Sequence, residues 1–188
     1  LLVVTLILSL YRVWRGEAMF DALTHTAFNV VSVVTTTGYA SDDYSQWGPF
    51  AAMAFFYLTF VGGCSGSTSG GMKIFRFQVA IKMLLSQLRF LIHTHGVFVS
   101  RYNGAPLSDE ISRGVVAFSF FFFLTIAGLA LALAMLGLDL VTALTGAATA
   151  VANVGPGLGD IIGPAGNFST LPDAAKWLLC VGMLMGRL

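Results

Sequence analysis

The chain has 188 residues, of which 56% are hydrophobic and only 10% are charged, and its formal net charge is +1. Soluble domains carry about 25% charged residues, so this composition excludes an ordinary soluble surface and indicates a chain that lies mostly in lipid. The small net charge gives no sign of a nucleic-acid partner, and Cys64 and Cys180 form no disulfide or metal-binding pattern.

Apolar segments of two lengths alternate along the chain. A membrane-crossing helix needs about 20 apolar residues, whereas runs of about 10–14 more often form re-entrant or buried segments. The sequence predicts the end of a first span at 1–14, a short helix at 19–34 with a glycine turn at 35–40, and a span at 49–92 with a glycine-rich break at 62–71. A full span at 111–136, a second short helix at 139–152 with its turn at 153–157, and a last span at 172–188 follow. Because the chain begins and stops inside apolar runs, we expect it to be part of a longer polypeptide.

The order of span, short helix, glycine turn and span occurs twice. Gly38 and Gly155 mark the two turns, and the short helices open with matching tetrapeptides at Asp21 and Asp139, each of which we expect to cap a helix N-terminus. Internal repeats are common in transport proteins, with the solute path at the repeat interface. We therefore predict an all-α membrane protein made of helix–re-entrant pore loop–helix repeats, over 1–93 and 111–188, joined by a cytoplasmic linker at 94–110.

Charge asymmetry predicts the orientation. The region between residues 73 and 113 has an excess of basic residues, whereas 41–48 and 158–171 contain Asp but no Lys or Arg. The positive-inside rule places the basic region in the cytoplasm, so both short helices enter from outside and return. Each then points the negative end of its dipole at the membrane centre, which favours a cation over an anion.

The two glycine turns are the predicted ion-binding elements. Thr36-Thr37-Gly38-Tyr39-Ala40 keeps the Thr, Gly and Tyr of TVGYG, the potassium-channel pentapeptide whose backbone carbonyls replace the hydration shell of the ion. Asn153-Val154-Gly155-Pro156-Gly157 occupies the same place in the second repeat. A plain glycine turn between helices is the alternative interpretation of each. Irregular backbone at membrane depth is tolerated where it is buried in protein or lines a cavity, which favours the filter.

The glycine-rich break is the predicted gate. It consists of Gly62, Gly63, Cys64, Ser65, Gly66, Ser67, Thr68, Ser69, Gly70 and Gly71. A phosphate-binding loop is excluded because Met72 stands where that motif requires Lys, and a close helix crossing through small residues remains the alternative. The offset between Pro49 and Pro172 aligns Cys64 with Arg187, so an intramembrane arginine is expected at the depth of this loop. We predict that Arg187 holds the loop closed; the alternative is an arginine that extends to the inner membrane surface.

Four motifs together resemble the TrkH family of bacterial potassium uptake proteins, in the superfamily shared with the Ktr and HKT proteins. They are TTTGYAS at 35–41, GGCSGSTSGGMK at 62–73, NVGPGLG at 153–159 and GRL at 186–188. The resemblance implies four repeats around one pore, of which this chain supplies two, with K⁺ bound at Thr37, Gly38, Val154 and Gly155. It also implies an inner-membrane homodimer and a cytoplasmic nucleotide-binding regulatory subunit, named TrkA in the Trk system, for which the basic stretch 73–113 is a candidate contact.

Two other classes of function remain open. A carrier with alternating access would couple K⁺ to protons or sodium, but carriers normally keep an ionisable residue near the midplane, and this chain has only Arg187 there. A membrane scaffold without transport would leave the two filter sequences unexplained. Since no nucleophile–base pair or paired carboxylates are present, the sequence does not predict an enzyme.

Overall fold

The computed structural model describes residues 1–93, 101–102 and 105–187, and its chain is mostly helical, as predicted. The first half of the chain forms four helices, and the second half forms three longer helices and two short ones. Their bounds are α1 Leu2–Trp14, α2 Met19–Val34, α3 Pro49–Phe60, α4 Ile74–Ile92, α5 Asp109–Met135, α6 Leu140–Ala152, α7 Gly159–Ile162, the 3₁₀ helix η1 Phe168–Thr170, and α8 Asp173–Arg187.

The predicted linker at 94–110 is not entirely irregular. It carries two strands of two residues each, β1 (Arg101–Tyr102) and β2 (Ala105–Pro106), which pair antiparallel. Residues 94–100 and 103–104 of this linker, and Leu188 at the end of the chain, lie outside the described residues. α5 begins at Asp109, two residues before its predicted start at 111, and its N-cap is Ser108, whose hydroxyl accepts a hydrogen bond from the Ile111 backbone N–H.

The two aspartates that open the short helices behave differently. Asp139 is the N-cap of α6 and accepts a hydrogen bond from the Thr142 backbone N–H at 3.1 Å, as predicted. The prediction for Asp21 is wrong, because α2 begins two residues earlier with Ala18 as its N-cap. Asp21 lies instead in the first turn of α2, where the helix dipole still favours a negative charge.

Only α5, among the described helices, is long and apolar enough to cross a membrane by itself. The helices α1, α2, α3 and α6 are shorter apolar helices of 12 to 16 residues. Large apolar side chains cover the outer surface of α5, including Phe120, Phe121 and Met135, which are 62%, 63% and 88% exposed. Such a surface suits lipid, because exposed apolar area of this extent is rare on soluble monomers.

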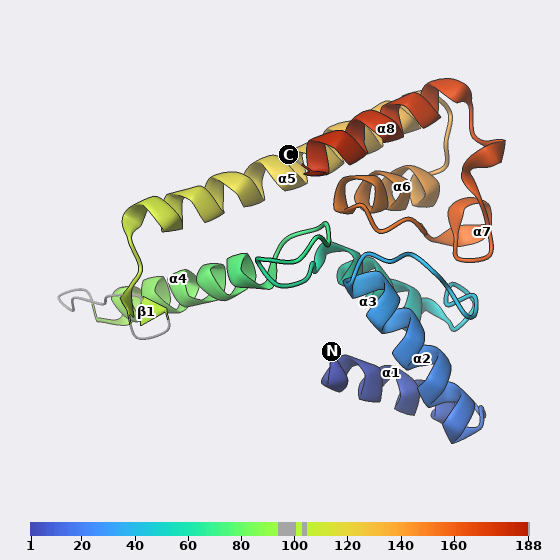
Figure 1. Ribbon diagram of the computed structural model, residues 1–188, viewed down its shortest axis with the longest axis horizontal. Coiled ribbons are helices and arrows are strands. Elements are labelled where there is room, and N and C mark those ends of the chain that lie inside the picture. The colour runs from blue at the N-terminus through green and yellow to red at the C-terminus, as the bar shows by residue number, and fades with distance from the viewer. Residues whose placement is uncertain (94–100, 103–104, 188) are drawn as a thin grey trace.

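Four helices pack around α6, namely α3, α5, α7 and α8. In Figure 1, α5 and α8 lie side by side with α6 next to them, and α1 packs against α2 near the N-terminus. Ten of the thirteen residues of α6 are buried, and all ten are Ala, Thr, Val or Gly. Small side chains let neighbouring helices approach closely, which is a common way for helices to associate in membranes. α3 contacts both α2 and α6, so it connects the two short helices.

Candidate functional site

Both glycine turns have an unusual backbone conformation. The φ angles are +55° at Thr36 and +81° at Gly38, and +55° at Asn153 and +117° at Gly155. Thr36 and Asn153 are the non-glycine residues with positive φ in the described chain. A left-handed conformation is uncommon for residues other than glycine, and non-glycine residues in such sparsely populated regions cluster at functional sites.

The same hydrogen bond holds each turn to its short helix. The Thr37 N–H donates to the Ser32 carbonyl at 2.9 Å, and the Val154 N–H donates to the Thr149 carbonyl at 3.0 Å. Side-chain hydroxyls at the same two helix positions also bind the turns: Ser32 Oγ donates to the Tyr39 carbonyl at 2.5 Å, and the Gly155 N–H donates to Thr149 Oγ1 at 3.0 Å. The two turns are thus built alike, each fixed by the last part of a short helix.

The two turns are in direct contact with each other. A Cβ added at Gly38 would overlap the Val154 carbonyl oxygen and lie 3.4 Å from Pro156 Cδ, and one added at Gly155 would lie 3.7 Å from Gly38 Cα. Gly38 is therefore glycine for two reasons, its positive φ and the lack of space. Tyr39, the next residue, is 74% exposed.

The glycine-rich segment forms a closed loop rather than a simple kink. The break runs from residue 61 to residue 73, slightly wider than the predicted 62–71. Its neck is closed by the Gly62 N–H, which donates to the Met72 carbonyl, and by the Met72 N–H, which donates to the Phe60 carbonyl, both at 2.9 Å. Cys64, Ser65, Gly66, Ser67 and Thr68 are exposed at the far end of this loop, which is called the glycine-rich loop below.

The buried part of the glycine-rich loop packs against both turns. The Gly70 N–H donates to Thr36 Oγ1 at 3.1 Å. A Cβ added at Gly70 would overlap the Ala152 carbonyl group, directly before the second turn, and lie 3.0 Å from Asn153 Cβ. The absence of a side chain at Gly70 is therefore required for this contact.

Arg187 reaches the glycine-rich loop from α8. Its Nη1 donates a hydrogen bond to the Thr68 carbonyl. The sequence offset aligned Arg187 with Cys64, and the contact lies four residues further along the same loop. α8 itself packs tightly on α6, because a Cβ added at Gly186 would overlap the Val151 carbonyl group, and Asn153 Nδ2 donates to the Met183 carbonyl at 3.1 Å.

Sequence reasoning missed a second cation at this loop. Lys73 Nζ donates to the Ser67 carbonyl at 2.9 Å and to the Ser69 carbonyl. A cavity of about 250 Å³ lies beside these contacts, and Lys73, Arg76 and Arg187 line it without an acidic side chain among the described residues. The available signal was the position of Lys73 at the start of α4, where the helix dipole disfavours a cation.

An ion cluster around the buried Arg12 supports the segment after the first turn, and sequence reasoning missed it too. Arg12 of α1 is 5% exposed and pairs through Nη2 with Glu17 at 2.6 Å and with Asp42 at 3.2 Å. Its guanidinium lies 3.7 Å from the centre of the Trp47 ring, whose Nε1 donates to Asp42 at 2.8 Å. The sequence did not predict this ion cluster because its residues come from separate elements.

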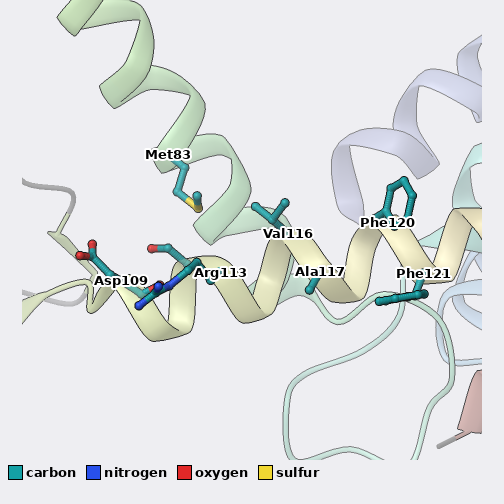
Figure 2. Close-up of a pocket in the computed structure, with 8 residues that line it drawn as sticks. Met83, Asp109, Arg113, Val116, Ala117, Phe120 and Phe121 are labelled. Carbon is teal, nitrogen blue, oxygen red and sulfur yellow. The ribbon is translucent and has the colours of Figure 1, made fainter.

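A larger cavity, of about 630 Å³, lies between α4 and α5, away from the two turns. In Figure 2, Met83 of α4 faces α5, and Asp109 and Arg113 lie at the start of α5, with Phe120 and Phe121 further along the helix. None of its lining residues belongs to a turn or to the glycine-rich loop, so this cavity is separate from the site described above. Among the described residues, no group of three His, Cys, Asp or Glu side chains is placed to bind a metal ion.

Comparison with known proteins identifies the family. The model of the family described as "TrkH: Cation transport protein" matches residues 13–188 of this chain. The chain belongs to this family. The predicted resemblance is confirmed, and since the TrkH family consists of transport proteins, so is the prediction that the chain is not an enzyme.

Relatives in the TrkH family are longer than this chain. The Trk system potassium uptake protein TrkI of Halomonas elongata is 76% identical over 188 residues, which are 100% of this chain and 38% of that protein. The potassium uptake protein TrkH of Escherichia coli is 32% identical and matches 98% of this chain and 37% of its own length. The crystal structure of the potassium transporter TrkH from Vibrio parahaemolyticus matches 99% of this chain and 40% of its own, with a TM-score of 0.91 at 30% identity.

Proposed function

We propose that this chain forms half of the wall of a potassium uptake pore in a bacterial inner membrane. The two turns, at Thr36–Tyr39 and Asn153–Pro156, supply backbone carbonyls of a selectivity filter, and the glycine-rich loop with Arg187 forms the gate. In this proposal 1–93 and 111–188 are two of four helix–pore loop–helix repeats, and 94–110 faces the cytoplasm. Two further repeats are needed to close the pore, because this chain covers 38% of TrkI.

The contact between Gly38 and the Val154 carbonyl group carries the proposal. Carbonyl filters are rings of backbone oxygens contributed by several loops around one axis. Two loops that come from separate halves of the chain, share one hydrogen-bond pattern and meet at their glycines are the arrangement that such a ring requires. TrkI of Halomonas elongata and TrkH of Vibrio parahaemolyticus are both named for potassium, which we propose as the transported ion here.

The short helices add electrostatic support for a cation. α2 ends at Val34 and α6 ends at Ala152, each directly before its turn. The C-terminus of a helix carries roughly half a negative charge, and neither helix has a basic residue in its last turn that would neutralise it. Both helices therefore favour a partly dehydrated cation at the turns.

The gate is supported by the charge and position of the glycine-rich loop. This loop lies against Thr36 and against the end of α6. The proposal puts it on the path of an ion that leaves the filter. Arg187 binds its Thr68 carbonyl and so holds the loop in place. Its positive charge adds an electrostatic barrier to cations while the loop is closed.

The proposed partners are membrane lipid, a second copy of the protein and a TrkA-like cytoplasmic nucleotide-binding subunit. The basic stretch 73–113, which contributes Met83, Asp109 and Arg113 to the α4–α5 cavity of Figure 2, is the proposed contact for the regulatory subunit. The charge asymmetry of the sequence supports a cytoplasmic position for this stretch.

Rubidium uptake into liposomes that contain the full-length protein tests the proposal. Uptake is expected to be blocked by K⁺ more than by Na⁺, to follow the membrane potential without a proton or sodium gradient, and to be lost in Gly155→Val, since a β-branched residue does not adopt the +117° φ of Gly155. Uptake that requires a second ion gradient would favour a carrier. Wild-type uptake in Gly155→Val would remove the filter assignment.

A further inference from the structure

Three successive carbonyls of the glycine-rich loop each accept a hydrogen bond from a side-chain cation. Lys73 Nζ donates to the carbonyls of Ser67, at 2.9 Å, and Ser69. Arg187 donates to the carbonyl of Thr68, which lies between them. Two tethered positive charges thus satisfy a continuous row of backbone oxygens.

Helix stability does not explain a lysine at position 73. Lys73 is the N-cap of α4, its side chain makes no capping hydrogen bond, and the first turn of α4 contains no acidic residue. A cation at a helix N-terminus is unfavourable because it meets the positive end of the dipole. The carbonyls of Ser67 and Ser69 are the groups that compensate the Lys73 charge, so its role is in the loop rather than in the helix.

The surroundings of Lys73 add to its positive charge rather than neutralising it. The cavity of about 250 Å³ beside the loop is lined by Lys73, Arg76 and Arg187, and its described lining contains no carboxylate. Arg76 differs from the other two because its guanidinium lies over the Phe118 ring, 3.6 Å from the ring centre. The loop carbonyls are therefore occupied by two of the three cations, and the third contributes charge alone.

We propose that the carbonyls of Ser67 and Ser69 form a monovalent-cation site on the glycine-rich loop, which the Lys73 ammonium occupies while the loop is closed and Arg187 holds the Thr68 carbonyl between them. This inference rests on the proposed function and extends it to the gate. An ammonium group and K⁺ carry the same charge, and neutral backbone carbonyls bind both. A potassium ion competes with the Lys73 ammonium for these oxygens. When K⁺ replaces the ammonium, the loop loses its link to α4 and is free to move. Lys73 is a positioning residue in this scheme.

The test uses Lys73→Met in the full-length protein, with Cys64 as the reporter in a background whose other cysteines are serine. Cys64 is exposed in the same loop, so its alkylation rate reports the loop conformation. The alkylation rate is measured as K⁺ replaces choline, and the K⁺ concentration that produces half of the change in rate is determined. In Lys73→Met we expect this concentration to fall by about tenfold or more, because a competing charge-assisted hydrogen bond is lost. Lys73→Arg, which keeps the charge and the donors, is expected to retain the wild-type concentration.

Arg76→Met is the matched control, because it removes one charge from the cavity and leaves the carbonyls occupied. It is expected to leave the K⁺ dependence of Cys64 alkylation unchanged. A wild-type K⁺ dependence in Lys73→Met, or an equal shift in Arg76→Met, would overturn the inference. If rubidium flux is lost in Gly155→Val at the same time, the proposed function stands and the cation site alone fails. Wild-type flux in Gly155→Val would instead remove the proposed function itself.

Discussion

Replacing Gly38 with alanine adds one methyl group where the two turns meet. Gly38 has a φ of +81°, and the added Cβ would overlap the Val154 carbonyl oxygen and lie 3.4 Å from its carbon. Holding alanine in a left-handed conformation costs about 1–2 kcal/mol, and inserting an extra carbon into a packed site costs about 1–3 kcal/mol. The two costs together oppose the native geometry of the turns by roughly 2–5 kcal/mol.

This penalty converts directly into a transport measurement. At about 1.4 kcal/mol per factor of ten, the lower value of about 2 kcal/mol reduces the ratio of intact to distorted filters by roughly 30-fold. We therefore expect rubidium flux through Gly38→Ala in liposomes to fall by at least about tenfold, with a smaller preference for K⁺ over Na⁺.

Gly137→Ala is the matched control for this prediction. Gly137, between α5 and α6, has a φ of +88°, and a Cβ added there would meet no atom within 4 Å. This variant carries the backbone cost of about 1–2 kcal/mol without the overlap, so a modest loss of thermal stability with normal flux is expected. Equal fluxes in the two variants would refute the argument that the contact between the turns shapes the filter.

Three further predictions concern contacts of the glycine-rich loop and of α6. Arg187→Ala is expected to raise rubidium flux about tenfold or more, since a hydrogen bond from a charged group contributes about 1.5–3 kcal/mol; unchanged flux would remove Arg187 from the gate. Gly70→Ala should lower the unfolding temperature in detergent by the equivalent of about 1–3 kcal/mol, whereas Gly66→Ala, whose Cβ would meet no atom within 4 Å, should not. Asp139→Ala should cost about 1 kcal/mol as a lost N-cap, and Asp21→Ala less. Hydrogen bonds from the Thr142 side chain and backbone hold the pKa of Asp139 below its usual value. The stabilisation of α6 by this cap should therefore be complete at pH values above the ordinary carboxyl pKa, and it should be lost as the pH falls through the lowered pKa of Asp139.

The helices themselves could be predicted closely because glycine, proline and aspartate mark their ends. The predicted short helix at 19–34 matches α2, and the second differs from α6 only by its N-cap, Asp139. Pro49 begins α3, as proline at a first helical position commonly does. The prediction of an N-cap at Asp21 was wrong because acidic residues are favoured both at the N-cap and in the first turn of a helix. The sequence alone does not distinguish the two positions.

Contacts between elements could be predicted only where the repeat supplied a second copy for comparison. The offset between two prolines brought Arg187 to the glycine-rich loop, although to the wrong residue within it. The repeat did not place Lys73 or Arg12. Lys73 binds carbonyls of the glycine-rich loop, and Arg12 pairs with Asp42. A sequence does not show which backbone carbonyls accept a hydrogen bond from a side chain, since every residue has a carbonyl. A lysine that binds them is therefore indistinguishable from a surface lysine until the fold is known.

The close packing of α8 against α6 and the second turn limits which part of the protein can move. Gly186 leaves no space for even a methyl group against Val151, and Asn153 is tied to the Met183 carbonyl. In the proposed pore, a sideways displacement of α8 would move the second turn with it and disturb ion coordination there. We therefore expect the proposed gate to open through movement of the Arg187 side chain and of the loop at residues 61–73, which is faster than displacement of a whole helix.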